Sequence, residues 1–271
     1  MRFWQLLAVA LGALFSGYSV ADDGSDRARK FSEFVRPAYP LLSAQAGLWE
    51  TDPEKISQRV DRAATGLAAV APDECNGEGF RRDLCGLRIF LQPSSSMEPT
   101  LRERELIVRK PYGDIAPKRG DIIVFNTRTN VSDKPELYVK RLVGLPGDVV
   151  ELRQGKVLVN GQSMPQAASG KDFKDLFGNE VEIFKETTPE GRQYEIGLST
   201  ANRPVAADEA GPFHVPQGHY FVLGDNRHNS ADSRFPDAIG EDGFIPAESV
   251  SGRIVMIFVS GEVERVGTVF E

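Results

Sequence analysis

Lys156–Val157–Leu158–Val159–Asn160–Gly161 combines a short apolar strand pattern with the residue pair that best favours a two-residue hairpin turn. Similar apolar segments, separated by turn residues, recur on both sides of it. They occupy residues 87–91, 122–125, 138–143, 149–152, 218–223 and 253–259. Because helical periodicity is scarce in this part of the chain, we predict a mainly antiparallel β domain over residues 87–271. Residues 163–212 are more irregular and charged, and we expect them to form an insertion between strands.

Residues 22–86 have a different pattern, which predicts a small α-helical N-terminal region. Asp52 suits the N-cap of a helix and Pro53 suits its first position. The apolar side chains that follow at helical spacing are Ile56, Val60, Ala63, Ala64 and Leu67. A shorter stripe of Phe31, Phe34 and Val35 precedes Pro37 and Pro40, and we expect these two prolines to break that helix.

Residues 1–21 are typical of a secretory signal peptide. Arg2 precedes an apolar run, and small and polar residues lead to Ala21. The apolar run is shorter than the roughly 20 residues that span a bilayer. We therefore expect an exported, periplasmic protein that is soluble or bound peripherally to the membrane. The alternative is an uncleaved single-pass anchor that holds the protein at the inner membrane, facing the periplasm.

The two cysteines, Cys75 and Cys85, lie close together in the sequence on either side of a charged, glycine-containing loop. In an oxidising compartment we expect them to form a disulfide, the alternative being two free buried thiols. The three histidines lack the spacing of metal ligands, so no metal site is predicted. The net charge of −7 and the absence of a Lys/Arg run argue against a nucleic-acid partner.

Three polar segments carry the chemically active side chains of the β domain. The first is Pro93–Ser94–Ser95–Ser96–Met97–Glu98–Pro99–Thr100–Leu101, which on its own is typical of a turn. The second, residues 138–148, places Lys140 inside an apolar strand. If Lys140 points inward, its desolvation lowers the pKa of the amine, as a lysine base requires. The third, residues 224–234, is too polar for a core element and indicates either a solvated loop or a network behind an active site.

These segments, together with residues 119–125, resemble in order the signature motifs of the type I signal peptidase family, serine proteases with a Ser–Lys dyad. The resemblance covers roughly residues 87–160 and 213–260. It implies an antiparallel β-sheet or partial-barrel catalytic domain that removes signal peptides from exported precursors after small residues at −1 and −3. No cofactor is implied.

The resemblance also implies roles for individual residues. Ser96 is the expected nucleophile and Lys140 its general base. Ser94 is expected to help bind the oxyanion, and Ser230 to orient the Lys140 amine. The pair expected to support the third segment is Asp232 and Arg234. The residues expected to bind the substrate as an added strand or to line its small pockets are Phe90, Leu91, Gln92, Pro93, Met97 and Tyr138.

The sequence departs from the family pattern in three places. Ser95 stands where a small residue such as glycine is usual, so a second hydroxyl lies beside the nucleophile. His228 stands where an acidic residue is common. We expect it to be exposed, the alternative being a histidine whose titration makes the stability or activity of the loop depend on pH. A polar, helical segment precedes the serine motif where the family has a membrane-spanning helix.

Three other functions fit parts of this pattern. A specialised Ser–Lys maturation peptidase, of the conjugation-pilus type, would act on one or a few exported substrates. A self-cleaving repressor is disfavoured by the export signal. A catalytically silent binding domain is disfavoured because both dyad residues are present.

Overall fold

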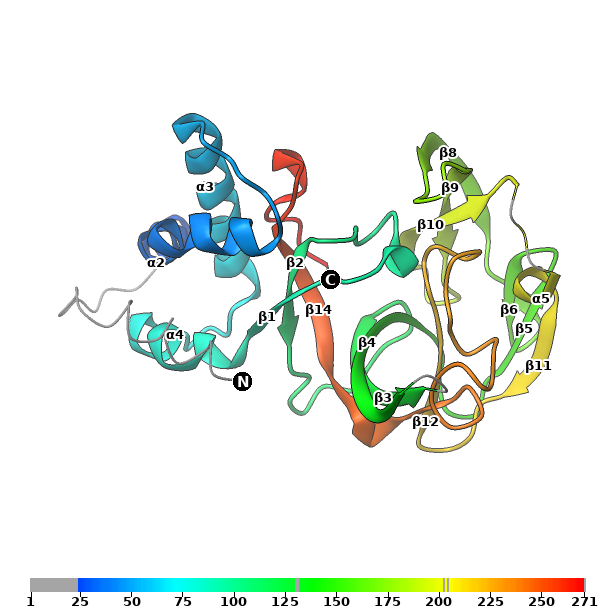
Figure 1. Cartoon of the computed structure of the whole chain (residues 1–271). Helices are drawn as coiled ribbons and strands as arrows, with labels where there is room; N and C mark the ends of the chain where they lie inside the picture. Colours follow the sequence, from blue (N-terminus) through cyan, green and yellow to red (C-terminus); the bar gives the residue numbers. More distant parts are fainter. Residues whose placement is uncertain (1–23, 130–131, 202, 204, 271) are drawn as a thin grey trace. The chain divides into compact units, whose positions relative to one another are not determined.

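The computed structural model describes residues 24–129, 132–201, 203 and 205–270 (Figure 1). The segment predicted as an export signal, residues 1–21, lies outside this range. The chain divides into two compact units. Unit 1 comprises Met1–Gln92, Arg104–Pro111 and Val255–Glu271, and unit 2 comprises Pro93–Glu103 and Tyr112–Ile254. Strand β14 (Val250–Val259) runs from unit 2 into unit 1.

Unit 1 contains the helical segment and a small part of the β structure. Its elements are α2 (Gly24–Gln45), α3 (Pro53–Val70), α4 (Gly77–Asp83), η1 (Leu84–Gly86), β1 (Arg88–Leu91), β2 (Leu106–Lys110), the second half of β14, and η4 (Val263–Arg265). Strands β1 and β2 pair antiparallel from Arg88↔Arg109 to Leu91↔Leu106. The buried faces of α2 and α3 share one apolar core with Met256 and Phe258 of β14. The helices of unit 1 are therefore part of its core rather than a loose appendage.

Helix α3 confirms the cap predicted for it, whereas helix α2 corrects a prediction. Asp52 accepts a hydrogen bond from the Glu54 N–H, and Pro53 opens α3. The prediction that Pro37 and Pro40 break the first helix is wrong, because both lie inside α2. A proline inside a helix costs about 3 kcal/mol. The apolar face continues through it, with Tyr39 buried against Phe258, and tertiary packing of this kind outweighs the local cost.

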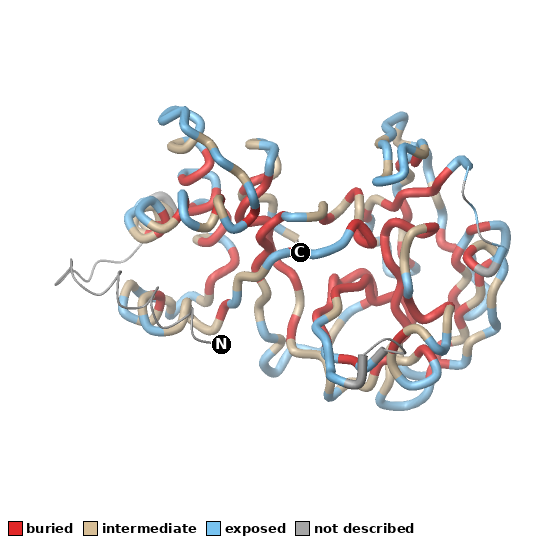
Figure 2. Tube along the Cα trace, viewed as in Figure 1, coloured by how far each residue is buried: buried red, intermediate tan, exposed pale blue. Residues whose placement is uncertain are grey.

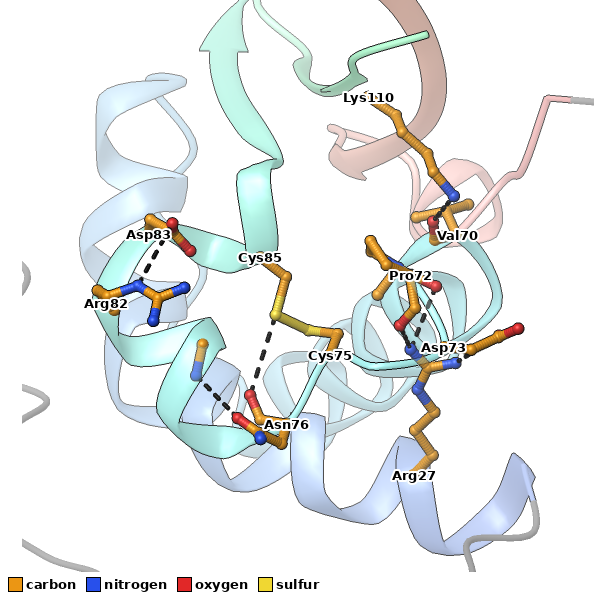
Figure 3. The surroundings of a disulfide bond; sticks show 12 residues. Arg27, Val70, Pro72, Asp73, Cys75, Asn76, Arg82, Asp83, Cys85 and Lys110 are labelled. Carbon is orange, nitrogen blue, oxygen red and sulfur yellow. Dashed lines mark hydrogen bonds and ion pairs between the residues drawn. A yellow bond between two sulfur atoms is a disulfide. The ribbon is translucent and has the colours of Figure 1, made fainter. Parts of the chain in front are cut away.

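The predicted disulfide joins Cys75 to Cys85, whose Cα atoms are 5.6 Å apart (Figure 3). The residues between them were expected to be a loop, but they include helix α4. Asn76 caps this helix by accepting a hydrogen bond from the Gly79 N–H, and Phe80 buries its ring on the core side. Asparagine is among the best N-cap residues, which explains how a sequence with two glycines begins a helix here.

Unit 2 contains three antiparallel sheets. The first pairs β3 (Ile122–Thr129) with both β4 (Ser132–Gly144) and the start of β14, and continues from β4 to β12 (His219–Leu223) and β13 (Ile245–Pro246). The second has the order β11 (Ala210–His214), β5 (Val149–Arg153), β6 (Lys156–Val159) and β7 (Gln162–Ser163). The third has the order β10 (Gln193–Ser199), β9 (Glu180–Thr187) and β8 (Gln166–Lys174). The short helices are η2 (Ser95–Met97), α5 (Val205–Asp208) and η3 (Ala247–Ser249). The prediction of a mainly antiparallel β structure is confirmed.

The hairpin predicted at Asn160–Gly161 is present. Both residues have positive φ, 53° and 78°, and Val159 pairs with Gln162 across the turn. These are the backbone angles that the Asn–Gly pair adopts most readily.

Residues 163–212 are irregular in sequence pattern, but strands β8, β9 and β10 form a regular meander there. That this segment is an insertion stays a prediction. At the start of β9, Val181 and Ile183 are buried while Glu180 and Glu182 are exposed, which is the alternation of a half-buried strand. The charged residues mask this alternation in the sequence. Leu176 and Phe177, in the turn between β8 and β9, are exposed. The trace at that end of the hairpin is coloured as exposed in Figure 2.

Among the described residues, no helix is both long and apolar enough to cross a membrane.

Candidate active site

The serine segment forms a tight, buried turn in unit 2. Ser94 is extended, and the 3₁₀ helix η2 (Ser95–Met97) follows it directly. Met97 and Leu101 have no exposed surface, and the Leu101 N–H donates to the Met97 carbonyl over 2.9 Å. These two apolar anchors fix the turn, so Ser96, which is 8% exposed, has a defined position.

Strand β4 presents Lys140 to this turn. Lys140 lies opposite Ile123 of strand β3, and its side chain is buried rather than exposed to solvent. Its Nζ lies 2.8 Å from Ser96 Oγ, and Ser96 Oγ lies 3.2 Å from Ser94 Oγ. The structure thus brings together the three side chains predicted for nucleophile, base and oxyanion donor.

Burial lowers the pKa of Lys140 from its ordinary value of 10.5 to about 8. Asp232 and Asp225 oppose this shift because their negative charges favour the ammonium form, while Arg234 adds to it. An amine with this pKa is partly neutral near pH 8, and only the neutral form has a lone pair that can accept a proton.

The loop of residues 224–234 is held by the buried pair predicted for it. The side chains of Asp232 and Arg234 are wholly buried and 2.8 Å apart. Asp232 also accepts a hydrogen bond from the Gly224 N–H over 3.0 Å. Burial by itself raises the pKa of Asp232, but these partners outweigh it and hold the pKa below its ordinary value. The loop therefore keeps a charged carboxylate near Lys140.

Ser230 lies at the site without the hydrogen bond predicted for it. A Cβ atom at Gly224 would lie 2.2 Å from Ser230 Oγ and 2.5 Å from the Ser96 carbonyl oxygen, so only glycine lets the loop approach the serine turn this closely. Ser230 Oγ is buried and makes no hydrogen bond, although it lies close enough to Asp232 to help lower the pKa of that carboxyl. Its orienting role toward Lys140 stays a prediction.

Sequence reasoning missed two residues, Asn226 and Asn229, that join the loop to the serine turn. The Asn226 N–H donates to the Ser96 carbonyl over 3.1 Å, and Asn226 Nδ2 donates to the Ser95 carbonyl over 3.3 Å. Asn229 Nδ2 donates to Ser95 Oγ over 2.9 Å. The hydroxyl of Ser95 is thus a hydrogen-bond acceptor for the loop. The signal available in the sequence was the concentration of amide side chains in an otherwise unexplained polar loop.

The residues predicted to bind substrate fall in different places. Met97 is buried in the serine turn, and Lys140 Nζ lies 5.6 Å from the centre of the Tyr138 ring. Phe90 and Leu91 are on β1, which is an edge strand among the described residues. Gln92, buried, and Pro93, exposed, follow it. An edge strand has backbone groups that an extended peptide can pair with, but this role stays a prediction.

The prediction that His228 is exposed is wrong. It is 8% exposed, its Nδ1 accepts a hydrogen bond from the Ser199 N–H, and its Nε2 lies 2.9 Å from Asp208 Oδ1. Burial lowers the pKa of His228, against the opposing effect of Asp208. The histidine is a structural link between the loop and the segment of residues 199–208.

Comparisons with known proteins agree on one family. The model of the family described as "Signal peptidase, peptidase S26" matches residues 85–259, which include the serine turn, Lys140 and the loop of residues 224–234. A signal peptidase I of Pseudomonas fluorescens is 35% identical over 190 residues, which cover 63% of this chain and 64% of the relative. The chain therefore spans slightly less than two thirds of that relative's length.

Two further relatives and one solved structure are similar. A probable signal peptidase I-2 of Synechocystis sp. is 35% identical over 67% of this chain and 69% of its own. A signal peptidase I of Rickettsia typhi is 36% identical over 64% of this chain and 72% of its own. A crystal structure of a signal peptidase I from Enterococcus faecalis is 28% identical over 51% of this chain and 96% of that chain, with a TM-score of 0.29.

Proposed function

The chain belongs to the signal peptidase family, peptidase S26, and we propose that it removes N-terminal signal peptides from exported precursors, with Ser96 as nucleophile and Lys140 as general base. The observation that carries this proposal is the 2.8 Å separation of Ser96 Oγ and a buried Lys140 Nζ whose pKa lies at about 8. This is the geometry and the basicity that proton transfer from a serine requires.

The reaction begins with Lys140 in its neutral form. The Ser96 O–H then donates to the Lys140 lone pair, loses its proton, and the oxygen attacks the carbonyl carbon of the scissile bond. The Ser94 hydroxyl and the Ser96 N–H donate hydrogen bonds to the resulting oxyanion. The Lys140 ammonium returns the proton to the leaving amine, and an ester between Ser96 and the signal peptide remains. Water, deprotonated by Lys140, hydrolyses that ester.

A cleavage assay tests the proposed specificity. The purified protein is expected to cut a signal-peptide substrate with alanine at −3 and −1 after the −1 residue. A matched peptide with a bulky residue at −1 should be cut at least about tenfold more slowly, because a small pocket excludes large side chains. Mass spectrometry of the products identifies the bond. Cleavage of both peptides at the same rate would contradict the general signal-peptidase specificity. Cleavage of only one natural precursor would contradict it too.

We further propose that the protein acts in the periplasm, as a soluble or membrane-peripheral enzyme. The sequence pattern of residues 1–21 and the Cys75–Cys85 disulfide support export to an oxidising compartment. Fractionation of cells that make a tagged protein, with mass spectrometry of its N-terminus, is expected to find a chain that begins at residue 22 and is released by alkaline extraction. A protein that keeps residues 1–21 and stays in the membrane after alkaline extraction would support the anchored alternative instead.

A further inference from the structure

A buried carboxylate lies at the centre of a hydrogen-bond network in the sheet of β10, β9 and β8, which falls within the predicted insertion and is called the inserted sheet below. Glu186, on strand β9, has no exposed surface. It accepts hydrogen bonds from Arg227 Nη1 over 2.9 Å and Arg227 Nη2 over 2.5 Å. The Tyr194 hydroxyl and Gln166 Nε2 donate to it over 2.8 and 3.0 Å. Burial by itself raises the pKa of Glu186, but Arg227 and these donors outweigh it, so the pKa lies below its ordinary value and the pair is charged.

Arg227 connects this carboxylate to the catalytic loop. Its side chain is 2% exposed, and its Nε donates to the Gly224 carbonyl over 3.2 Å. The backbone of the same stretch is tied to strand β10 of the inserted sheet. The Gly197 N–H donates to the Asp225 carbonyl over 2.9 Å, and the Arg227 N–H donates to the Gly197 carbonyl over 3.0 Å. The inserted sheet therefore holds both the side chain and the main chain of this loop.

The position of the loop determines two properties of the dyad. Asn226 holds the Ser96 carbonyl, and Gly224 packs against the same carbonyl, so a shift of the loop moves the nucleophile. Burial lowers the pKa of Lys140, while Asp232 and Asp225 of this loop raise it, so a loop that moves changes the pKa of the base. Asp225 is itself held by Arg141, whose guanidinium lies 4.2 Å from the centre of the Tyr194 ring.

We propose that Glu186 is a positioning residue for the Ser96–Lys140 site, acting through Arg227. The inserted sheet then contributes to catalysis by holding the loop that positions Ser96 and Lys140. This inference rests on the proposed function.

The test replaces Glu186 by glutamine, which keeps the shape and removes the charge that pairs with Arg227. In Glu186→Gln, kcat for the model signal peptide is expected to fall by about 10–10²-fold, with KM little changed, because the dyad is misplaced while the peptide contacts remain. The pH midpoint of kcat is expected to differ from that of the wild type, because the loop sets both the burial of Lys140 and the charges around it. A variant that merely folds less completely would lose active enzyme without moving that midpoint, and acylation by a serine-directed inhibitor measures the active fraction.

Two further variants make the test decisive. Glu182 lies on the same strand but is exposed, so Glu182→Gln should match the wild type in kcat and in pH midpoint. Arg227→Lys keeps the positive charge but loses the bidentate hydrogen bonds to Glu186. It should show the same change in kcat and pH midpoint that is expected of Glu186→Gln, and it tests the inference even if Glu186→Gln does not fold. If Glu186→Gln or Arg227→Lys is folded and has the kcat and midpoint of the wild type, the inference is wrong. An inactive wild-type protein would contradict the proposed function itself.

Discussion

Ser96→Ala is expected to reduce cleavage of a signal-peptide substrate by at least about 10⁴-fold, because it removes the hydroxyl that forms the ester intermediate. Ser96 Oγ is the hydroxyl in contact with the Lys140 amine, at 2.8 Å. The measurement is kcat/KM on the purified variant, with the amount of acylated enzyme as a second readout. Neither product nor acyl-enzyme should accumulate.

Ser95→Ala is the matched control for this result, since it removes a hydroxyl one residue away. Ser95 Oγ accepts a hydrogen bond from Asn229 and makes no contact with Lys140 among the described interactions. Loss of one such bond costs about 1 kcal/mol, so activity should stay within about tenfold of the wild type. If Ser95→Ala abolishes cleavage and Ser96→Ala does not, the nucleophile has been assigned to the wrong serine.

Activity is expected to rise with pH through about 8 and to level off above it, because Lys140 must be neutral and its pKa lies at about 8. A lysine loses its positive charge as the pH rises past its pKa, so the fraction of active enzyme increases with pH. Lys140→Met, which removes the base, should lose about 10⁴-fold or more in kcat. Lys140→Arg should be equally inactive, because arginine stays protonated at every accessible pH.

The measurement is kcat/KM for the wild type from about pH 6 to about pH 10, beside Lys140→Met at the upper end. The matched control is Lys185→Met, which removes an exposed lysine of strand β9 and should leave the profile unchanged. A wild-type profile that is flat through this range, or one that declines above pH 7, would rule out a lysine base.

Local signals were sufficient for the elements whose conformation is decided by adjacent residues. Asn160–Gly161 needs only its own backbone preferences to turn, and Asp52 needs only the next helical N–H groups to cap α3. The pairing of Ser96 with Lys140 came from a resemblance in motifs, since nothing in the sequence alone places a residue of strand β4 beside η2.

Interactions between distant segments explain the failures. Pro37 and Pro40 remain inside α2 because of the core on which the helix packs. His228 is buried because Ser199 and Asp208, distant in sequence, contact its two ring nitrogens. Glu186 and Lys185 are adjacent charged residues in the sequence, and nothing local distinguishes them. Glu186 is buried because it pairs with Arg227, which is distant in sequence, whereas Lys185 is exposed.

The long sequence separations in the site determine when its contacts can form during synthesis of the chain. Ser96 precedes Lys140 by 44 residues, and Ser95 precedes Asn229 by 134. At a synthesis rate of about 5–20 residues per second, Asn229 follows Ser95 by roughly 7–27 seconds. During this interval the nucleophile has been made but the loop that holds it has not. The contacts that fix Ser96 can therefore form only after the loop of residues 224–234 has been made.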